Sequence, residues 1–378
     1  MKNKYLGILI VFILLALALS GCTNGKTTSS WGYAAVDGSN VIFTNTSSVI
    51  ALSTVNGSVR WTYPEKATAS RMFFSAPTLS EKGMNGDEQV LLGDSAGLLV
   101  SISNNDGSTL YWSFDRAQGK YISSPVIVDD VVIAPNTDGF VYFIELSEDK
   151  SGWTIDAARS FPARKDIDNR GMDSNALGAF WANPVSDGTT VYVPNMNHFV
   201  YAVDIASGTE KWNQDLGGPL VAEPLLSDAG VLYVGTLNSM LYALDTTDGH
   251  ILWSQTLTGG IWSEPVLKDG QLFIGDESGM ITILNAEDGN IINTINKETA
   301  VLGRGIDLGD AIAFADESGS LFAIDASGAS VWSETVPGNI YSNLVYDGEQ
   351  LYILPSGGDQ LLYAFDTKGV EIWNYSSK

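Results

Sequence analysis

A short phrase that ends in tryptophan recurs about every forty residues along the chain, and no other feature constrains the fold as strongly. The phrase is an apolar run followed by Asp, a turn with Gly four residues later, and a second run that closes on Trp. Its cleanest copy leads from Leu241 through Asp245 and Gly249 to Trp253. The other copies end at Trp61, Trp112, Trp153, Trp212, Trp332 and Trp373, and a degenerate copy ends at Asn293. Eight copies at one period predict a repeat architecture, with one structural unit for each copy.

Each unit is expected to hold four short antiparallel strands, because runs of three to six apolar residues alternate with turns rich in Asp, Asn and Gly. The first run of most units contains a proline, which suits a strand with one unpaired edge. These prolines are Pro77, Pro125, Pro184, Pro224 and Pro265. No helical period is evident beyond residue 30, so almost no helix is expected.

Four-stranded units repeated around an axis are typical of a β-propeller. The sequence therefore predicts an all-β fold, an eight-bladed β-propeller of four-stranded antiparallel blades over residues 31–378, with units starting near residues 33, 73, 121, 180, 220, 261, 301 and 340. Each Trp is expected to pack its ring on the neighbouring blade and to donate its N–H to a backbone carbonyl. The tryptophans are thus predicted to join blades, and no cofactor role is expected for them.

The first 21 residues have the character of a lipoprotein signal peptide. Lys2 and Lys4 precede an apolar run, and small residues lead into Cys22, the only cysteine of the chain. This arrangement resembles the lipobox of bacterial lipoproteins, which implies cleavage before Cys22 and lipidation of its side chain. Residues 22–30 are small and polar and are predicted to form a flexible tether. The protein is therefore expected to be exported and anchored to a membrane by lipid.

Charge excludes one class of partner. The chain carries 44 acidic and 20 basic residues, a net charge of −24. A strongly acidic protein is repelled by phosphate backbones, so nucleic-acid binding is not expected.

The repeated phrase resembles that of the PQQ-like propellers, the quinoprotein-dehydrogenase-like family. Besides the copy that ends at Trp253, the copies that carry the resemblance are residues 200–212 and 362–373. This fold hosts enzymes, sensors and scaffolds, so the resemblance implies the fold more than the function. The quinoprotein dehydrogenases of the family hold a metal and close the quinone site with adjacent cysteines. Because Cys22 is the only cysteine here, we expect neither PQQ nor another cofactor, and no catalytic residues or enzymatic activity.

No metal site is expected either. His198 and His250 lie in turns of different units, without a Cys or carboxylate at ligand spacing. The acidic turns that begin at Asp276 and Asp316 are too short for calcium loops. Their Asp side chains are expected to bond the backbone and shape the turns.

One set of residues is a candidate for the central channel. The position before each first-strand proline, or its equivalent, is predicted to line one end of the channel. It is occupied by Ala76, Ser124, Asn183, Glu223, Glu264, Arg304 and Asn343. An Arg304 flanked by Glu223 and Glu264 could hold a small polar ligand or form a solvated ring of ion pairs, and we favour the ion pairs.

The spacing between tryptophans lengthens at two places, from Trp61 to Trp112 and from Trp153 to Trp212. The second interval contains residues 158–181, where basic and aromatic residues cluster as they do in interface hot spots. The predicted partner-binding residues are Arg159, Arg164, Lys165, Arg170, Phe180 and Trp181.

Export, a lipid anchor and an eight-unit ring together resemble the BamB-like lipoproteins, which act as non-catalytic scaffolds in β-barrel assembly at the outer membrane. The resemblance implies envelope protein partners bound through propeller loops, with a β-barrel assembly complex as the candidate partner. It implies the periplasmic face of the outer membrane in a diderm source, and the outer face of the cytoplasmic membrane otherwise. The alternative is a ligand-binding propeller, or a relative of the PQQ-dependent dehydrogenases, acting at the central channel.

Overall fold

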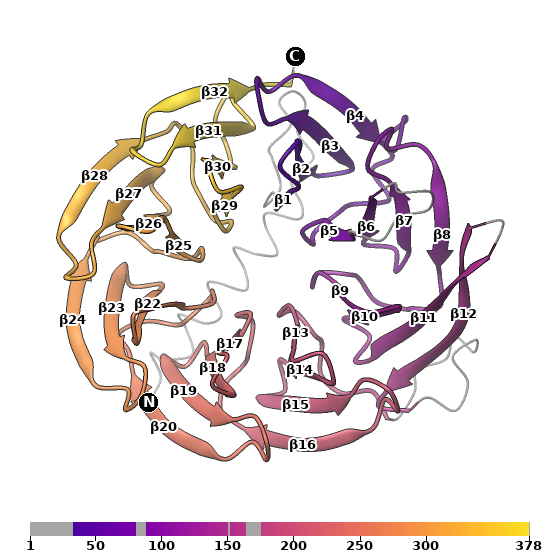
Figure 1. Cartoon of the computed structure of the whole chain (residues 1–378), viewed down its shortest axis with the longest axis horizontal. Helices are drawn as coiled ribbons and strands as arrows, with labels where there is room; N and C mark the ends of the chain where they lie inside the picture. Colours follow the sequence, from indigo (N-terminus) through magenta and orange to yellow (C-terminus); the bar gives the residue numbers. More distant parts are fainter. Residues whose placement is uncertain (1–32, 81–87, 150–151, 164–174, 378) are drawn as a thin grey trace, which may run out of the picture.

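The computed structural model describes residues 33–80, 88–149, 152–163 and 175–377. These residues form eight four-stranded antiparallel sheets arranged as blades around a central channel, with the first strand of each blade innermost (Figure 1). The predicted all-β, eight-bladed propeller is confirmed. The described part of the chain contains no helix, and hence none that could span a membrane.

The blades follow one another along the chain, and strand order within each blade is sequential. Blade 1 contains β1 (Ala34–Val36), β2 (Asn40–Asn45), β3 (Ser48–Ser53) and β4 (Val59–Tyr63). Blade 2 contains β5 (Thr78–Ser80), β6 (Gln89–Gly93), β7 (Leu99–Ser103) and β8 (Leu110–Phe114). Blade 3 contains β9 (Val126–Val128), β10 (Val131–Pro135), β11 (Val141–Asp149) and β12 (Gly152–Phe161). Blade 4 contains β13 (Val185–Ser186), β14 (Thr190–Pro194), β15 (Phe199–Asp204) and β16 (Glu210–Asp215).

The second half of the ring repeats this plan. Blade 5 contains β17 (Leu225–Leu226), β18 (Val231–Gly235), β19 (Met240–Asp245) and β20 (Ile251–Thr256). Blade 6 contains β21 (Val266–Lys268), β22 (Gln271–Gly275), β23 (Met280–Asn285) and β24 (Ile291–Asn296). Blade 7 contains β25 (Ile306–Asp307), β26 (Ile312–Ala315), β27 (Ser320–Ile324) and β28 (Ser330–Thr335). Blade 8 contains β29 (Val345–Tyr346), β30 (Gln350–Ile353), β31 (Leu362–Asp366) and β32 (Glu371–Tyr375).

The prolines of the repeat lie directly before an innermost strand. Pro125, for example, precedes β9, and Pro224 precedes β17. The innermost strand pairs on only one side, so a residue without an N–H is tolerated at its start. The prediction that these strands form the inner edge of each blade is confirmed.

The hydrophobic core lies between blades. The described residues contain eight core clusters, and each joins side chains of two neighbouring blades. One cluster, for example, packs Val200 and Ala202 of blade 4 against Leu232 and Leu244 of blade 5. Burial of apolar surface between sheets therefore holds the ring together.

The recurring tryptophans stabilise these junctions as predicted. Trp212 of blade 4 donates its indole N–H to the Thr246 carbonyl of blade 5, with a nitrogen–oxygen distance of 2.9 Å. Its ring lies against Gly249, where a Cβ atom would come within 2.5 Å of the indole. Gly249 also has a φ of +79°, so both backbone conformation and space require glycine. The same pair of contacts occurs at Trp61, Trp253, Trp332 and Trp373.

Asn293 takes the tryptophan position of blade 6. It donates to the Ser327 carbonyl of blade 7 over 2.8 Å and approaches Gly328, but it is exposed and has no ring to bury. The amide thus preserves the hydrogen bond of this junction, while the side chains of Ile283 and Ile295 supply apolar contact beside Gly328.

The last blade packs directly on the first. The core cluster at this junction combines Val41 and Phe43 with Tyr352 and Leu362. Trp373 donates to the Thr54 carbonyl over 2.9 Å, as at the other junctions. Each blade is built from one continuous stretch of chain, so among the described residues no strand is exchanged between the ends of the ring.

We predict that Trp253→Ala lowers the free energy of unfolding by about 3 kcal/mol, since it removes both the apolar contacts of a half-buried indole and its hydrogen bond to the Ala286 carbonyl. Leu252→Ala is the matched control, because the Leu252 side chain next to it is 45% exposed. Urea titration of the two variants measures the difference. Equal destabilisation by both substitutions would contradict the role of the indole.

Candidate functional site

The residues predicted to line the channel form a hydrogen-bonded belt on the connections that lead into the innermost strands. The Ser124 backbone N–H donates to Asn183 Oδ1 over 2.7 Å, and its hydroxyl donates to the Ala76 carbonyl over 3.1 Å. Asn183 Nδ2 in turn donates to Glu223 Oε2 over 2.9 Å. Each bond crosses a blade junction, so the belt ties blades 2 to 5 together at the channel.

A second group of bonds ties blades 6 to 8. Arg304 Nη1 donates to Glu264 Oε2 over 2.6 Å, and the Arg304 backbone N–H donates to Asn343 Oδ1 over 2.8 Å. The Glu264 side chain is 12% exposed and that of Arg304 is 39% exposed. The ion pair predicted from the sequence is therefore present, within a belt whose other bonds have neutral donors.

The pKa of Glu264 is raised to about 7, because burial and the negative charge of Glu223 raise it by more than the neighbouring Arg304 lowers it. A carboxyl group with such a pKa exchanges its proton near neutral pH. The belt thus contains a group whose charge depends on pH in the physiological range.

The predicted partner-binding segment is only partly a loop, because β12 continues to Phe161. Arg159 lies on this strand, directly opposite Phe143 of β11. In blade 5 the equivalent place, opposite Ala243, is taken by Trp253. Arg159 donates to the Ile205 carbonyl of blade 4, forms an ion pair with Glu145, and lies 5.3 Å from the centre of the Phe143 ring. It therefore replaces tryptophan at the junction of blades 3 and 4, and we remove it from the partner-binding set.

The prediction that Trp153 joins two blades is wrong. The β11–β12 hairpin is longer than its counterparts in the other blades (Figure 1). The backbone of Trp153 pairs with Glu148 near the end of this hairpin, whereas the junction position opposite Phe143 is held by Arg159. The sequence did carry a sign that this unit is irregular. In the regular copy Gly249 follows Asp245 by four residues, but no glycine stands four residues after Glu145. The hairpin instead brings Leu146 and Ile155 against Trp112, whose indole N–H has no hydrogen-bond partner among the described residues.

The prediction that Phe180 binds a partner is also wrong. Phe180 is fully buried in the cluster between blades 3 and 4, with Val141 and Val191. Trp181, next in the chain, is only half-buried. Arg164, Lys165 and Arg170 lie outside the described residues, as does Cys22.

Trp181 belongs to a ring of positions that the sequence analysis missed. The residue two places before each belt residue is half-buried and apolar or aromatic in blades 2 to 8. The members are Phe74, Ile122, Trp181, Val221, Trp262, Leu302 and Tyr341. Because each stands two residues before a belt residue, this spacing could have been found in the sequence. The result is a ring of partly exposed apolar side chains next to the polar belt.

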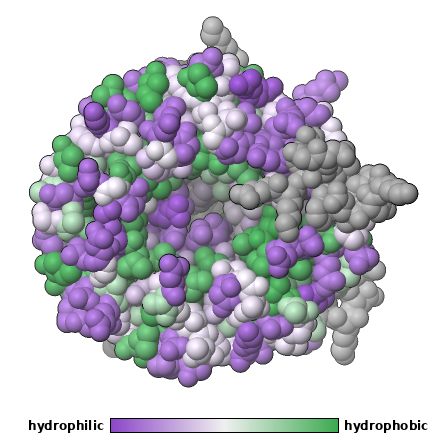
Figure 2. Space-filling model, viewed as in Figure 1, coloured by the Kyte–Doolittle hydropathy of each residue, from purple (hydrophilic) through white to green (hydrophobic). Residues whose placement is uncertain are grey.

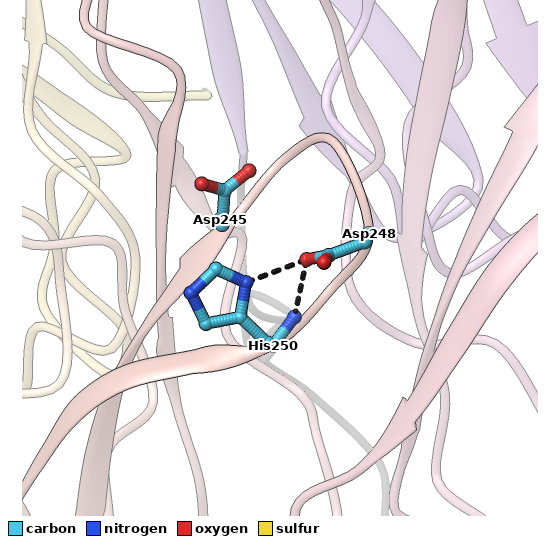
Figure 3. Close-up of side chains that lie close together, drawn as sticks. All are labelled: Asp245, Asp248 and His250. Carbon is cyan, nitrogen blue, oxygen red and sulfur yellow. Dashed lines mark hydrogen bonds and ion pairs between the residues drawn. The ribbon is translucent and has the colours of Figure 1, made fainter.

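One histidine does have carboxylates close to it, contrary to the sequence analysis. His250 Nδ1 lies 2.6 Å from Asp248 Oδ1, and ligand atoms of Asp245, Asp248 and His250 all lie within 4.8 Å of one another (Figure 3). The hydrogen bond to Asp248 raises the pKa of His250. Asp245 Oδ1 also accepts the Thr247 backbone N–H over 2.8 Å. These bonds shape an exposed turn of the repeat, and we assign no metal to it.

The acidic turns behave as predicted. Asp276 Oδ1 accepts the backbone N–H groups of Ser278 and Met280 over 2.9 Å and 3.1 Å. Asp316 makes the equivalent bonds to Ser318 and Ser320. Asp276 and Asp316 are both buried, and each shapes a turn.

Comparison with known proteins identifies the repeat. A sequence model of the family described as outer membrane protein assembly factor BamB matches residues 18–193, 146–231, 199–302 and 297–378. No curated protein matches the sequence.

Three solved structures illustrate the likeness of fold. BamB from Moraxella catarrhalis is 16% identical, with a TM-score of 0.65 over 87% of this chain and 94% of that one. The computationally designed Ika8 protein is 11% identical, with a TM-score of 0.67 over 93% of this chain and 98% of that one. The C-terminal WD40 domain of Sif2 is 12% identical, with a TM-score of 0.66 over 88% of this chain and 93% of that one. At these identities the likeness shows the fold alone.

We predict that Glu264 makes the protein less stable as pH rises. Its folded pKa of about 7 lies above the ordinary value of 4.5 for a glutamate, so the folded state binds the proton more tightly. The stabilisation that comes from this proton is complete below pH 4.5 and is lost as pH rises through 7, a change in the free energy of unfolding on the order of 3 kcal/mol. Glu264→Gln should remove this part of the pH dependence in urea titrations between pH 5 and pH 8.

Glu334→Gln serves as the control, because Glu334 is exposed on the outer strand β28. It should leave the pH dependence of the unfolding free energy unchanged. A Glu264→Gln variant with the same pH dependence as the parent protein would show that Glu264 does not titrate near neutral pH.

Proposed function

Because the chain belongs to the family described as outer membrane protein assembly factor BamB, we propose that it is a non-catalytic envelope scaffold that binds protein partners. The observation that carries the proposal is the extent of the family match, which runs from residue 18 to residue 378 and includes every blade. The partner we propose is a component of a β-barrel assembly complex at the outer membrane.

The arrangement of polar groups supports a scaffold. In the belt, Asn183 bonds Glu223 and Arg304 bonds Glu264, each across a blade junction, which fits a role in holding the ring. A rigid ring with variable connections is suited to presenting binding residues, because connections can change while the junctions stay packed.

We place partner binding on the connection between blades 3 and 4, at Trp181 together with Arg164, Lys165 and Arg170. This connection is where the regular unit is interrupted, and it combines three basic residues with an aromatic one. The half-buried Trp181 offers apolar area beside them, the combination that interface hot spots favour.

Attachment to the membrane is proposed through lipid on Cys22. A basic start, an apolar run and small residues before the only cysteine support this assignment. With the signal removed, residues 22–30 would link the lipid to the propeller. The protein would then face the periplasm from the outer membrane in a diderm source.

Affinity capture of the tagged protein from solubilised membranes should recover a membrane partner. Neutralising Arg164, Lys165 and Arg170 together to Gln is expected to reduce recovery at least about tenfold, through loss of charge-assisted contacts. The control neutralises Arg60, Lys66 and Lys368, three exposed basic residues of blades 1 and 8 and their loops. Equal recovery with both triple variants would refute the assignment to this connection.

Cys22→Ser should abolish acyl labelling and move the protein from the membrane fraction to the soluble fraction, because the acyl chains supply the membrane affinity. Metabolic labelling with palmitate followed by fractionation measures both effects. Membrane retention of an unlabelled Cys22→Ser protein would contradict lipid anchoring.

A further inference from the structure

The ring of partly exposed apolar side chains beside the belt has no described member in blade 1. The channel opens at the centre of the propeller, and apolar as well as hydrophilic residues surround the opening (Figure 2). In blades 2 to 8 each member of the apolar ring begins a triplet that ends in the belt residue, such as Trp262, Ser263 and Glu264 in blade 6. The middle residue of all seven triplets is buried and is Ser, Ala or Gly. Each place in the apolar ring is therefore marked by an apolar residue, a small residue and a belt residue in succession.

The strand register locates the belt position of blade 1. In blade 6 the belt residue Glu264 stands two places before Val266, which pairs with Phe273, the third residue of β22. In blade 1 the third residue of β2 is Ile42, and it pairs with Ala35. The belt position of blade 1 is therefore two places before Ala35.

The triplet of blade 1 is thus Trp31, Gly32 and Tyr33. An aromatic residue and a small residue fill its first two places, as in the other blades. Tyr33 is tied to β2, because its N–H donates to Thr44 Oγ1 over 3.2 Å and its carbonyl accepts the Thr44 N–H over 3.0 Å. Trp31 stands only two residues from this tied point, so the place of blade 1 in the apolar ring is within its reach.

We propose that Trp31 docks at the belt end of the channel and gives the apolar ring its eighth member. Its neighbours in the ring would be Tyr341 of blade 8 and Phe74 of blade 2, which are both half-buried. An indole packed beside them would withdraw a large apolar area from water. Docking explains why the only aromatic residue between Cys22 and Tyr33 stands in phase with the seven other triplets.

A docked Trp31 would fix where the tether leaves the propeller. The innermost strands begin at the belt end of the channel, and the connection that carries Trp181 leads into one of them. Residues 22–30 span at most about 30 Å when fully extended. This step rests on the proposed lipid at Cys22: a lipid in the membrane would then hold the belt end, and with it Trp181, toward that membrane. The partner would be met at the membrane surface.

Alkylation of single cysteines tests the docking in the full chain with Cys22→Ser, which has no other thiol. In blades 2 to 8 the residue before the ring member is buried, and Ser30 takes that place in blade 1. Ser30→Cys should therefore react with N-ethylmaleimide at least about tenfold more slowly than Thr28→Cys in the tether. Adding Trp31→Ala should remove the protection of position 30 while the circular dichroism spectrum stays that of the parent, and Trp31→Phe should keep the protection. Docking is refuted if positions 30 and 28 react equally fast, or if Trp31→Ala leaves the rate at position 30 unchanged.

Energy transfer tests the orientation of the lipidated protein on phosphatidylcholine vesicles that contain rhodamine-labelled phosphatidylethanolamine. Lys120 is exposed on the connection into β9, at the belt end, and Asp248 is exposed in the β19–β20 turn, at the opposite end. A donor dye on Lys120→Cys should transfer more energy to the lipid than one on Asp248→Cys, and equal or reversed transfer would overturn the orientation. Protein that does not bind the vesicles would refute the lipid anchor, and the alkylation rates would still decide whether Trp31 docks.

Discussion

The contact between an outer-strand side chain and a glycine turn of the next blade is the interaction on which the ring depends. Trp212 against Gly249 shows its two parts, an indole that covers a backbone without a Cβ and an N–H that satisfies a carbonyl of the same turn. Because the same contact closes blade 8 on blade 1 through Trp373, the ring needs no exchanged strand among its described residues. The closed shape follows from repetition of one junction.

The sequence was sufficient for the architecture because this junction leaves a periodic mark. Trp, Gly and the inner-strand prolines each fix one place in the unit, so blade number and strand order could be predicted. The role of Arg159 could not be predicted, because the spacing of the tryptophans pointed to Trp153 as the junction residue of blade 3. Only the strand register shows that Arg159 lies opposite Phe143. Phe180 was misjudged for a related reason, since an aromatic residue beside charged ones can equally belong to the core. The group around His250 depended on how tightly the turn folds, which residue spacing does not reveal.

The candidate site was predicted in part. The offset of one residue from the prolines placed Glu223, Glu264 and Arg304 together, and the structure confirms the pairing of the last two. The sequence could not show that Glu223 bonds Asn183 in place of Arg304, nor that burial would raise the pKa of Glu264 to about 7. Both depend on the distance between blades at the channel and on desolvation there. Function in such a ring is expected where the repeat is broken, as at the connection between blades 3 and 4.

The central claim is that this propeller is a scaffold whose partner meets the ring beside Trp181. Site-specific photo-cross-linking in living cells tests it most directly, with the photoreactive residue placed at Trp181 or at Ile292, which is 52% exposed on the outer strand of blade 6. The account predicts a discrete adduct with an envelope protein from position 181 and none from position 292. No adduct from position 181, or the same adduct from both positions, would contradict it.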